Sequence, residues 1–141
     1  MSLPQVALTK YDCHQVYSAK QVLENEAHVA KKGQLAMFKL MTRAGEAAFT
    51  ELNTHWPAAK HILLLCGKGN NGGDGFIVAR LAHLAGIKVT VLITCQPTQI
   101  TGDAKTAYEM MLAEGVKQVF KEQLCEHITN FQGDVIVDAL F

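Results

Sequence analysis

The sequence has no excess of charge of either sign, no long apolar run and no paired cysteines. Its 141 residues include 13 Lys and Arg against 13 Asp and Glu, so the formal net charge is zero. A neutral chain without a dense basic stripe argues against a non-specific DNA- or RNA-binding protein. No apolar run approaches the roughly 18 residues of a membrane span, so no membrane-spanning helix is predicted. The hydrophobic content of 49% is too high for a disordered chain and predicts a folded domain.

The cysteines lack the spacing of a zinc site or of a redox pair. Cys13, Cys66, Cys95 and Cys125 are far apart in the sequence, with no C-x-x-C pair and no cluster with histidine. The N-terminus lacks the charged and then apolar pattern of a signal peptide. We therefore expect reduced thiols and a cytoplasmic location.

The first part of the chain is predicted to be helical. Residues 18–21 (Ser-Ala-Lys-Gln) form a capping box, which predicts a helix that starts there and continues to about Lys32. A second helix is expected from about Gln34 to His55, ended by Trp56-Pro57. Apolar residues recur along it every three to four positions and predict one buried face. These residues are Met37, Leu40, Met41, Ala44, Ala48 and Leu52.

Beyond residue 57, short apolar strands alternate with helices. The continuous apolar run 61–66 predicts a strand buried on both faces, as in a parallel sheet. Further strands are expected at 88–94, 116–120 and 134–140, with helices at about 75–85, 101–114 and 122–130. This order is typical of an α/β, Rossmann-like fold of three layers (αβα), with a mostly parallel sheet and two N-terminal helices. Right-handed crossovers would place residues 67–74 and 95–100 at one edge of the sheet, facing a common crevice.

A glycine-rich loop, Gly67–Gly75 (GKGNNGGDG), follows the first strand. Glycines permit positive φ and close approach of a ligand, and a helix N-terminus offers N–H groups to a phosphate. The loop matches G-x-G-x-x-G, but the second strand is not followed by the acid that holds a dinucleotide ribose. A Walker A loop does not fit, because no Gly-Lys-Ser/Thr follows. The oxygens of Asn70, Asn71 and Asp74 can instead hold a hard cation or hydroxyl groups.

This loop, followed by Ala79-Arg80, resembles the signature of the YjeF N-terminal family, the NAD(P)H-hydrate epimerases. Upstream, Lys20-Gln-Val22 and Leu40-Met-Thr-Arg-Ala-Gly45 resemble the helical lead-in of that family. Downstream, Thr101–Ala104 and Val137–Phe141 also fit. The resemblance spans residues 18–141, and the loop is far more specific than a lone G-x-G-x-x-G.

The resemblance implies a Rossmann-like isomerase of nicotinamide cofactor repair. The family interconverts the R and S epimers of NADHX or NADPHX, which are hydrated at C6 of the nicotinamide ring. A dehydratase that acts on the S epimer, fused or separate, then restores NAD(P)H. By the motif match, substrate would be bound by Asn70, Asn71, Gly72, Gly73 and Asp74, and a potassium ion by Asn71 and Asp138. The sequence leaves open the choice between NADHX and NADPHX, and whether the chain forms a homodimer.

No catalytic residue is identified from the sequence. Reversible loss of the C6 hydroxyl, assisted by the ring nitrogen, needs a general acid–base group near C6. A carboxylate that coordinates potassium is poorly placed to move protons, which argues against Asp138. Asp74 adjoins a helix N-terminus, where the charged form is favoured. In the family the segment that ends here at Phe141 continues into a glycine-rich substrate loop. Residues 1–141 are therefore expected to be a single domain of this family, incomplete at its C-terminal end, with the acid–base group beyond Phe141.

Two other functions and some simpler residue roles remain open at this point. An ordinary dinucleotide-dependent oxidoreductase is one alternative, although the missing acid after the second strand counts against it. A non-catalytic module that keeps the nucleotide pocket and presents its N-terminal helices to a protein partner is the other. Without the resemblance, Asp138 is a strand-end cap and Lys68 either a solvated charge or a phosphate ligand. Arg80 is expected to be a structural ion-pair partner.

Overall fold

The computed structural model describes residues 18, 20–21, 24–25, 28 and 37–141. The chain divides into two units, Met1–Leu35 and Ala36–Phe141. In the first unit the described positions from 20 to 28 are helical. Gln21 Oε1 accepts from Ser18 N at 2.9 Å, and Ser18 Oγ accepts from Gln21 N at 3.3 Å. The predicted capping box is confirmed, whereas the expected helix end near Lys32 lies outside the described residues.

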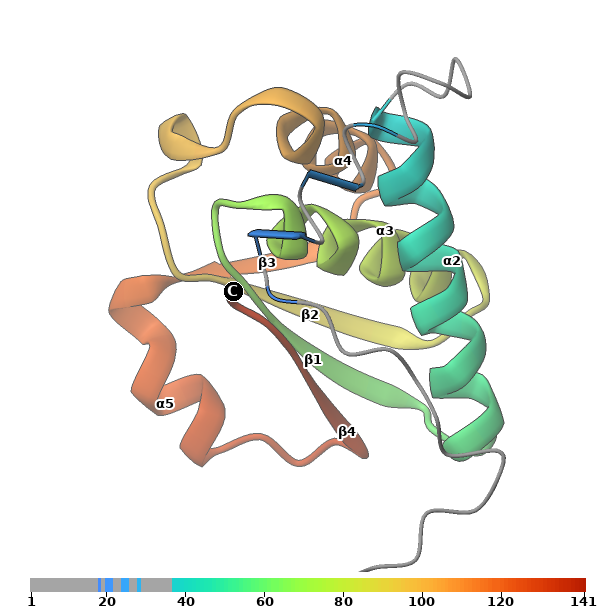
Figure 1. Cartoon of the computed structure of the whole chain (residues 1–141). Coiled ribbons are helices and arrows are strands. Elements are labelled where there is room, and N and C mark those ends of the chain that lie inside the picture. The colour runs from blue at the N-terminus through green and yellow to red at the C-terminus, as the bar shows by residue number, and fades with distance from the viewer. Residues whose placement is uncertain (1–17, 19, 22–23, 26–27, 29–36) are drawn as a thin grey trace, which may run out of the picture. The chain divides into compact units, whose positions relative to one another are not determined.

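The second unit is built on a four-stranded parallel sheet with the strand order β3-β2-β1-β4 (Figure 1). Its strands are β1 (His61–Cys66), β2 (Lys88–Ile93), β3 (Lys117–Phe120) and β4 (Val135–Ala139). Strand β1 is central, and Leu64 pairs in register with Val91 of β2 and Val137 of β4. This position explains its unbroken apolar run, because both faces of a central strand are covered.

Helices cover the two faces of the sheet. They are α2 (Met37–His55), α3 (Asn70–Leu84), α4 (Gly102–Ala113) and α5 (Leu124–Thr129), with 3₁₀ turns η1 (Pro97–Gln99) and η2 (Lys121–Gln123). Helices α3 and α4 lie side by side on one face, and α2 packs on α3 rather than on the sheet (Figure 1). Strand β4 lies on the far side of β1 from β3, so a right-handed crossover carries α5 over the opposite face. The three-layer, Rossmann-like α/β fold is confirmed.

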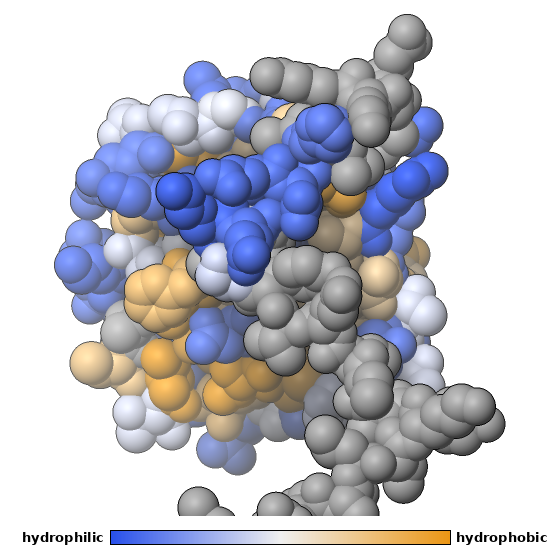
Figure 2. Space-filling model, viewed as in Figure 1, coloured by the Kyte–Doolittle hydropathy of each residue, from blue (hydrophilic) through white to orange (hydrophobic). Residues whose placement is uncertain are grey.

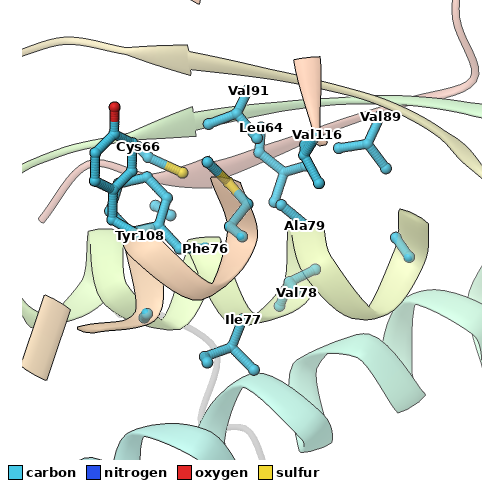
Figure 3. Close-up of a cluster of buried hydrophobic side chains, with 14 of the residues drawn as sticks. Leu64, Cys66, Phe76, Ile77, Val78, Ala79, Val89, Val91, Tyr108 and Val116 are labelled. Carbon is cyan, nitrogen blue, oxygen red and sulfur yellow. The ribbon is translucent and has the colours of Figure 1, made fainter. Parts of the chain in front are cut away.

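The core lies between the sheet and α3 (Figure 3). Leu64 and Val91 of the sheet are fully buried, and the ring of Phe76 on α3 lies 5.2 Å from that of Tyr108 on α4. Ile77 points from α3 in the other direction, toward α2 (Figure 3). Helix α3 is therefore buried on both sides, between the sheet and α2.

The buried face of α2 differs from the predicted one. Met41 and Leu52 are buried as expected, but Ala44 and Ala48 are exposed, and Gly45 is buried instead. A Cβ on Gly45 would lie 2.5 Å from Ile77 Cβ, so α2 approaches α3 most closely at a residue without a side chain. The helical period alone could not identify this contact, because glycine carries no hydrophobic signal.

The elements after α3 match their predicted positions to within a few residues. Gly86 and Gly115, which follow α3 and α4, have φ of 82° and 78°, as glycines at helix ends commonly do. Thr101 precedes α4 as expected, but its side chain makes no capping hydrogen bond. The helix expected from residue 122 starts as the 3₁₀ turn η2, so α5 is only six residues long.

The short α5 covers only part of its face of the sheet. Figure 2 shows hydrophobic surface in the lower half of the view, where Figure 1 has α5 and β4. Ile136 of β4 is 48% exposed and Ile128 of α5 is 36% exposed. In the part of the chain that the structure describes, no helix has the length and apolar character needed to cross a membrane.

Candidate functional site

The carboxyl ends of β1, β2 and β4 are tied together at one edge of the sheet. Gly67 N donates to Ala139 O at 3.0 Å, which joins the end of β1 to that of β4. Thr94 N and Thr94 Oγ1 both donate to Cys66 O, at 3.1 and 3.2 Å, which joins the end of β2 to that of β1. The predicted common edge for the segments after β1 and β2 is confirmed.

The glycine-rich segment is mostly helix rather than loop. Helix α3 begins at Asn70, so the connection after β1 is only Gly67–Gly69, and Asn70–Asp74 form the first turns of the helix. The predicted helix start near Gly75 was therefore wrong. The glycines of this segment do not have positive φ; among the described glycines, positive φ occurs at Gly86, Gly102 and Gly115.

Close packing against the strand ends explains two of these glycines. A Cβ on Gly72 would collide with the carbonyl oxygen of Gly67. A Cβ on Gly75 would lie 2.7 Å from Ala139 Cβ and 2.8 Å from Cys66 Sγ. Real Cβ atoms do not approach other atoms so closely, so α3 can rest on the ends of β1 and β4 only without side chains at these positions.

A third glycine lies where three helices meet. A Cβ on Gly73 would lie 2.6 Å from Met41 Sδ of α2 and 3.1 Å from Ala104 Cα of α4. Glycine lowers the stability of an isolated helix by about 1 kcal/mol relative to alanine. The first turn of α3 is therefore held by its tertiary contacts and not by its own helix propensity.

The N-terminus of α3 offers main-chain donors at this edge. The N-cap is Gly69, which has no side chain to cap the helix, and the first main-chain bond runs from Gly73 N to Gly69 O at 3.0 Å. The N–H groups of Asn70, Asn71 and Gly72 precede that bond and have no acceptor within the helix. Because α3 has 15 residues, its dipole adds a positive end to these donors. The arrangement can hold a phosphate or another anion.

The five predicted substrate-binding residues lie together in these turns. Asn70 is exposed, Asn71 and Asp74 are half-buried, and Gly72 and Gly73 are buried. The two glycines can therefore contact a ligand only through the main chain, whereas the other three also offer side-chain oxygens. The structure confirms that these residues are neighbours; their role toward substrate stays a prediction.

Asp138, the second expected potassium ligand, lies on β4 at the same edge. It pairs in register with Leu65 of β1 and is exposed. Its Oδ1 accepts from Leu140 N at 3.0 Å, which matches the simpler interpretation as a strand-end cap. A Cβ on Gly67 would lie 2.5 Å from Leu140 O, so the segment after Asp138 packs against the connection that leads to Asn71. Among the described residues, no three His, Cys, Asp or Glu side chains cluster as metal ligands.

Two thiols at the same edge were not predicted as site residues. Cys66 ends β1 and is fully buried, and Cys95 follows β2 and is half-buried; both are free. Burial raises the pKa of both thiols, while the Lys68 ammonium near Cys95 acts in the opposite direction on its pKa. Both thiols are therefore protonated near neutral pH and are poor nucleophiles. Their places at the carboxyl ends of parallel strands could have identified them as residues of this edge.

Arg80 has the structural role expected for it. Its Nε and Nη2 donate to Glu114 Oε1 at 3.1 and 2.7 Å, which ties α3 to the end of α4. Both side chains are about two-thirds buried or more. Arg80 is thus committed to this ion pair and is separate from the candidate site.

A parallel sheet in this order, with a glycine-packed helix N-terminus at its carboxyl edge, defines a Rossmann-like α/β protein. The sequence profile of the family described as "YjeF-related protein N-terminus" matches residues 37–141, and the chain belongs to this family.

Named relatives agree with this assignment. The chain is 44% identical over 126 residues to the bifunctional NAD(P)H-hydrate repair enzyme Nnr of Coxiella burnetii, which covers 89% of this chain but 25% of that enzyme. It is 33% identical over 136 residues to the NAD(P)H-hydrate epimerase of Pirellula staleyi, covering 92% of this chain and 58% of the relative. The crystal structure of yeast ynu0 has the same fold, with a TM-score of 0.77 and 24% identity over 91% of this chain and 57% of that one.

Proposed function

We propose that the protein interconverts the R and S epimers of NADHX and NADPHX. The proposal is carried by the first turns of α3, where main-chain N–H groups and the side chains of Asn70, Asn71 and Asp74 lie at the carboxyl edge of the sheet. Ligands of open parallel sheets bind at this edge. Relatives named NAD(P)H-hydrate epimerase and repair enzyme supply the substrate class.

The proposed binding mode follows from the chemistry of this turn. The N–H groups of residues 70–72 hold the pyrophosphate, because a helix N-terminus favours an anion. The Asn70 amide donates hydrogen bonds to substrate hydroxyl groups or accepts them, and the Asp74 carboxylate accepts them. Asp74 acts as an ionised, orienting carboxylate, since the same helix end favours its charged form.

The proposed reaction breaks and re-forms one C–O bond. The C6–O bond breaks with a proton delivered to the departing hydroxyl, the ring nitrogen lone pair supplies electrons, and water leaves. Water then adds to C6 from the other face and loses a proton, which restores the starting composition with inverted configuration. A general acid–base group accelerates such steps by roughly 10² to 10⁴-fold.

The potassium ion is a further part of the proposal. Asn71 and Asp138 would hold it, since an amide oxygen and a carboxylate are the donors that hard cations prefer. The packing of Leu140 against Gly67 brings their segments to one corner of the edge. When bound, the ion would supply a fixed positive charge that orients substrate oxygens. Asp138 would then be a cation ligand and not the proton donor.

The S epimer would be the substrate of a dehydratase, either fused to this segment or separate. The bifunctional relatives are about four times as long as the matched segment, which supports a fused arrangement in those proteins. For this chain the fused partner, a homodimer and a cytoplasmic location all stay predictions.

The direct test follows one epimer into the other. Purified full-length natural polypeptide is incubated with R-NADPHX, and the S epimer is measured by chromatography against the spontaneous rate. We expect acceleration that is greater in potassium than in sodium salts. Asn71→Ala and Asp138→Asn should each reduce the rate at least tenfold, whereas Asn53→Ala, at an exposed position of α2, should not.

The alternatives give different outcomes in the same assay. Conversion no faster than the spontaneous rate would refute the epimerase. Tight binding of undamaged NAD together with hydride transfer would instead favour an oxidoreductase, although β2 is followed by Thr94, Cys95 and Gln96 without a ribose-binding acid. Nucleotide binding without either reaction would favour a non-catalytic module.

A further inference from the structure

A cavity lies at the opposite edge of the sheet from the candidate site, between the sheet and α5. It has a volume of about 410 Å³. Residues at or near the amino ends of three strands line it on one side, and the middle of α5 with the segment after this helix lines the other. Since all four strands are parallel, this edge is separated from Asn70–Asp74 by the length of the strands. The cavity is therefore distinct from the proposed epimerase site.

Cationic side chains gather around this cavity. Lys88 and Lys117 start β2 and β3, and His61 starts β1. Among the described residues, neither lysine takes part in an ion pair. His127 also lines the cavity, and Glu126 is the carboxylate that lines it. The balance of charge at the cavity is positive and suits an anionic ligand.

The charges at the strand ends act on one another. Burial lowers the pKa of His61 most, and the positive charges of Lys88 and Lys117 lower it further. The Asp134 carboxylate opposes this effect, but its Oδ2 already accepts from Lys60 N at 2.7 Å and His61 N at 2.9 Å. Asp134 is thus engaged by main-chain groups, and among the described residues neither lysine forms an ion pair with Glu126 or with Asp134.

The other residues that line the cavity are the apolar Leu63 and Phe131 and the polar Thr90, Asn130 and Gln132. Leu63 is 1% exposed, and the ring of Phe131 packs edge-on against His61 with the ring centres 4.9 Å apart. Thr90 is 5% exposed, and its Oγ1 lies 3.4 Å from His61 Nε2. The cavity therefore combines a cationic rim with a wall that can pack on a carbon skeleton.

We propose that this cavity binds a small organic phosphate, whose phosphoryl group contacts Lys88 and Lys117 while its carbon skeleton packs on Phe131. The volume lies in the range of about 300–1,000 Å³ that is typical of small-molecule sites. Ammonium groups bind phosphoryl oxygens through charge-assisted hydrogen bonds. The inference does not depend on the proposed epimerase activity.

Three probes separate the two parts of the proposed ligand. Phenyl phosphate carries both the anion and an apolar ring, inorganic phosphate only the anion, and phenol only the ring. Binding is followed at low salt by calorimetry and by the NMR signals of the His61 and His127 rings. We expect saturable binding in the order phenyl phosphate, inorganic phosphate, phenol. Bound phosphate should raise the pKa of His61, because it offsets the two ammonium charges.

Substitutions of the lining residues test whether the ligand binds in the cavity. Replacement of both lysines, Lys88→Gln with Lys117→Gln, should weaken phenyl phosphate at least tenfold. Phe131→Ala should weaken phenyl phosphate but leave inorganic phosphate unchanged. Lys105→Gln is the matched control, since this lysine of α4 is exposed and lies outside the cavity. Circular dichroism checks that each variant is folded, and the single lysine variants replace the double one if it is not.

Two results would overturn the proposal. One is no saturable binding of either phosphate. The other is binding that survives the lysine replacements. The backbone amide NMR signals of Asn70, Asn71 and Gly72 supply the distinction from the epimerase site: they should not shift when phenyl phosphate binds. Shifts at these amides without shifts at His61 would place the phosphate at the carboxyl edge and would contradict a site under α5.

Discussion

The two edges of the parallel sheet are held by different parts of the chain. At the carboxyl edge, many of the contacts involve main-chain groups and glycines. Gly67 N donates a hydrogen bond to Ala139 O, and Gly72 packs against the Gly67 carbonyl. At the amino edge, main-chain bonds from Lys88 N to Lys60 O and from Asp134 N to His61 O are supplemented by a side chain, because the Asp134 carboxylate accepts from two backbone N–H groups. The carboxyl edge has three closely packed glycines, Gly67, Gly72 and Gly75, against Gly133 at the amino edge, so it should tolerate added side chains less well.

The dipole of α3 also distinguishes the two edges of the sheet. Helix α3 begins at the carboxyl edge and ends at the amino edge, where Lys88 follows it after Gly86 and Ile87. The positive helix end thus faces the edge with few charged side chains, and the negative end faces the edge with lysines and histidines. The carboxyl edge can attract an anion through its amides, while the amino edge must use side chains.

The largest effect is expected for Gly72→Ala. The added Cβ would collide with the Gly67 carbonyl. The stability lost through this collision should exceed the stability gained from the higher helix propensity of alanine. We expect the free energy of unfolding to fall by about 2–3 kcal/mol, measured by urea denaturation. Gly69→Ala is the matched control, because a Cβ there meets no atom within 4 Å. Equal stability of the two variants would show that the carboxyl edge is not tightly packed.

A smaller effect is expected at the amino edge for Asp134. Hydrogen bonds from Lys60 N and His61 N hold the pKa of its carboxyl below the usual value. A carboxyl whose folded pKa is lowered stabilises the protein above its unfolded pKa of about 3.9, and this stability is lost as the pH falls through the folded value. Asp134→Ala should therefore lower the melting temperature at pH 7. The difference from the native protein should shrink between about pH 5 and pH 2.

The control for this pH dependence is a neutral acceptor. The Asp134→Asn side chain can still accept hydrogen bonds through its amide oxygen but does not titrate. The part of the fall in melting temperature at acid pH that comes from this carboxyl should therefore be absent in the variant. His61 contributes in the same direction: its lowered pKa favours the neutral ring, so acid below about pH 6.5 destabilises the fold. An Asp134→Asn protein with an unchanged acid transition would contradict the assignment to Asp134.

The smallest effect is expected for Glu114→Gln. This change removes the charge that Arg80 binds at 2.7 Å, in a pair that is largely but not fully buried. We expect a loss of about 1 kcal/mol in the free energy of unfolding. Glu109→Gln, which removes the exposed Lys105 pair at 3.8 Å, should change stability by less than about 0.5 kcal/mol. A loss at Glu114 as large as that at Gly72 would remove the contrast between a side-chain ion pair and a closely packed glycine.

Strands and helix ends were predictable from the sequence because their signals are local. The apolar run 61–66, the capping box at Ser18, and the glycines Gly86 and Gly115 each depend on a few neighbouring residues. The common edge of the strands followed from the handedness of crossovers, which is a general property of parallel sheets. The family resemblance likewise rested on a contiguous motif.

The first residue of α3 and the buried face of α2 were not predictable from local sequence signals. Asn70–Asp74 has little helix propensity, and a local interpretation made it a loop. In the folded chain it is helical because Gly72, Gly73 and Gly75 allow α3 to lie against strand ends and two other helices. Gly45 is buried in α2 for the same reason, while Ala44 and Ala48 are not.

The sequence by itself determined the α/β class, the order of its elements and the segment that lies at the carboxyl edge. Those properties depend on apolar runs and turn residues close together in the chain. The tertiary structure decided that the glycine motif is a packed helix start, and that Lys88, Lys117, His61 and Phe131 share a cavity. Such contacts join residues far apart in sequence, and only the packing of helices on the sheet brings them within reach.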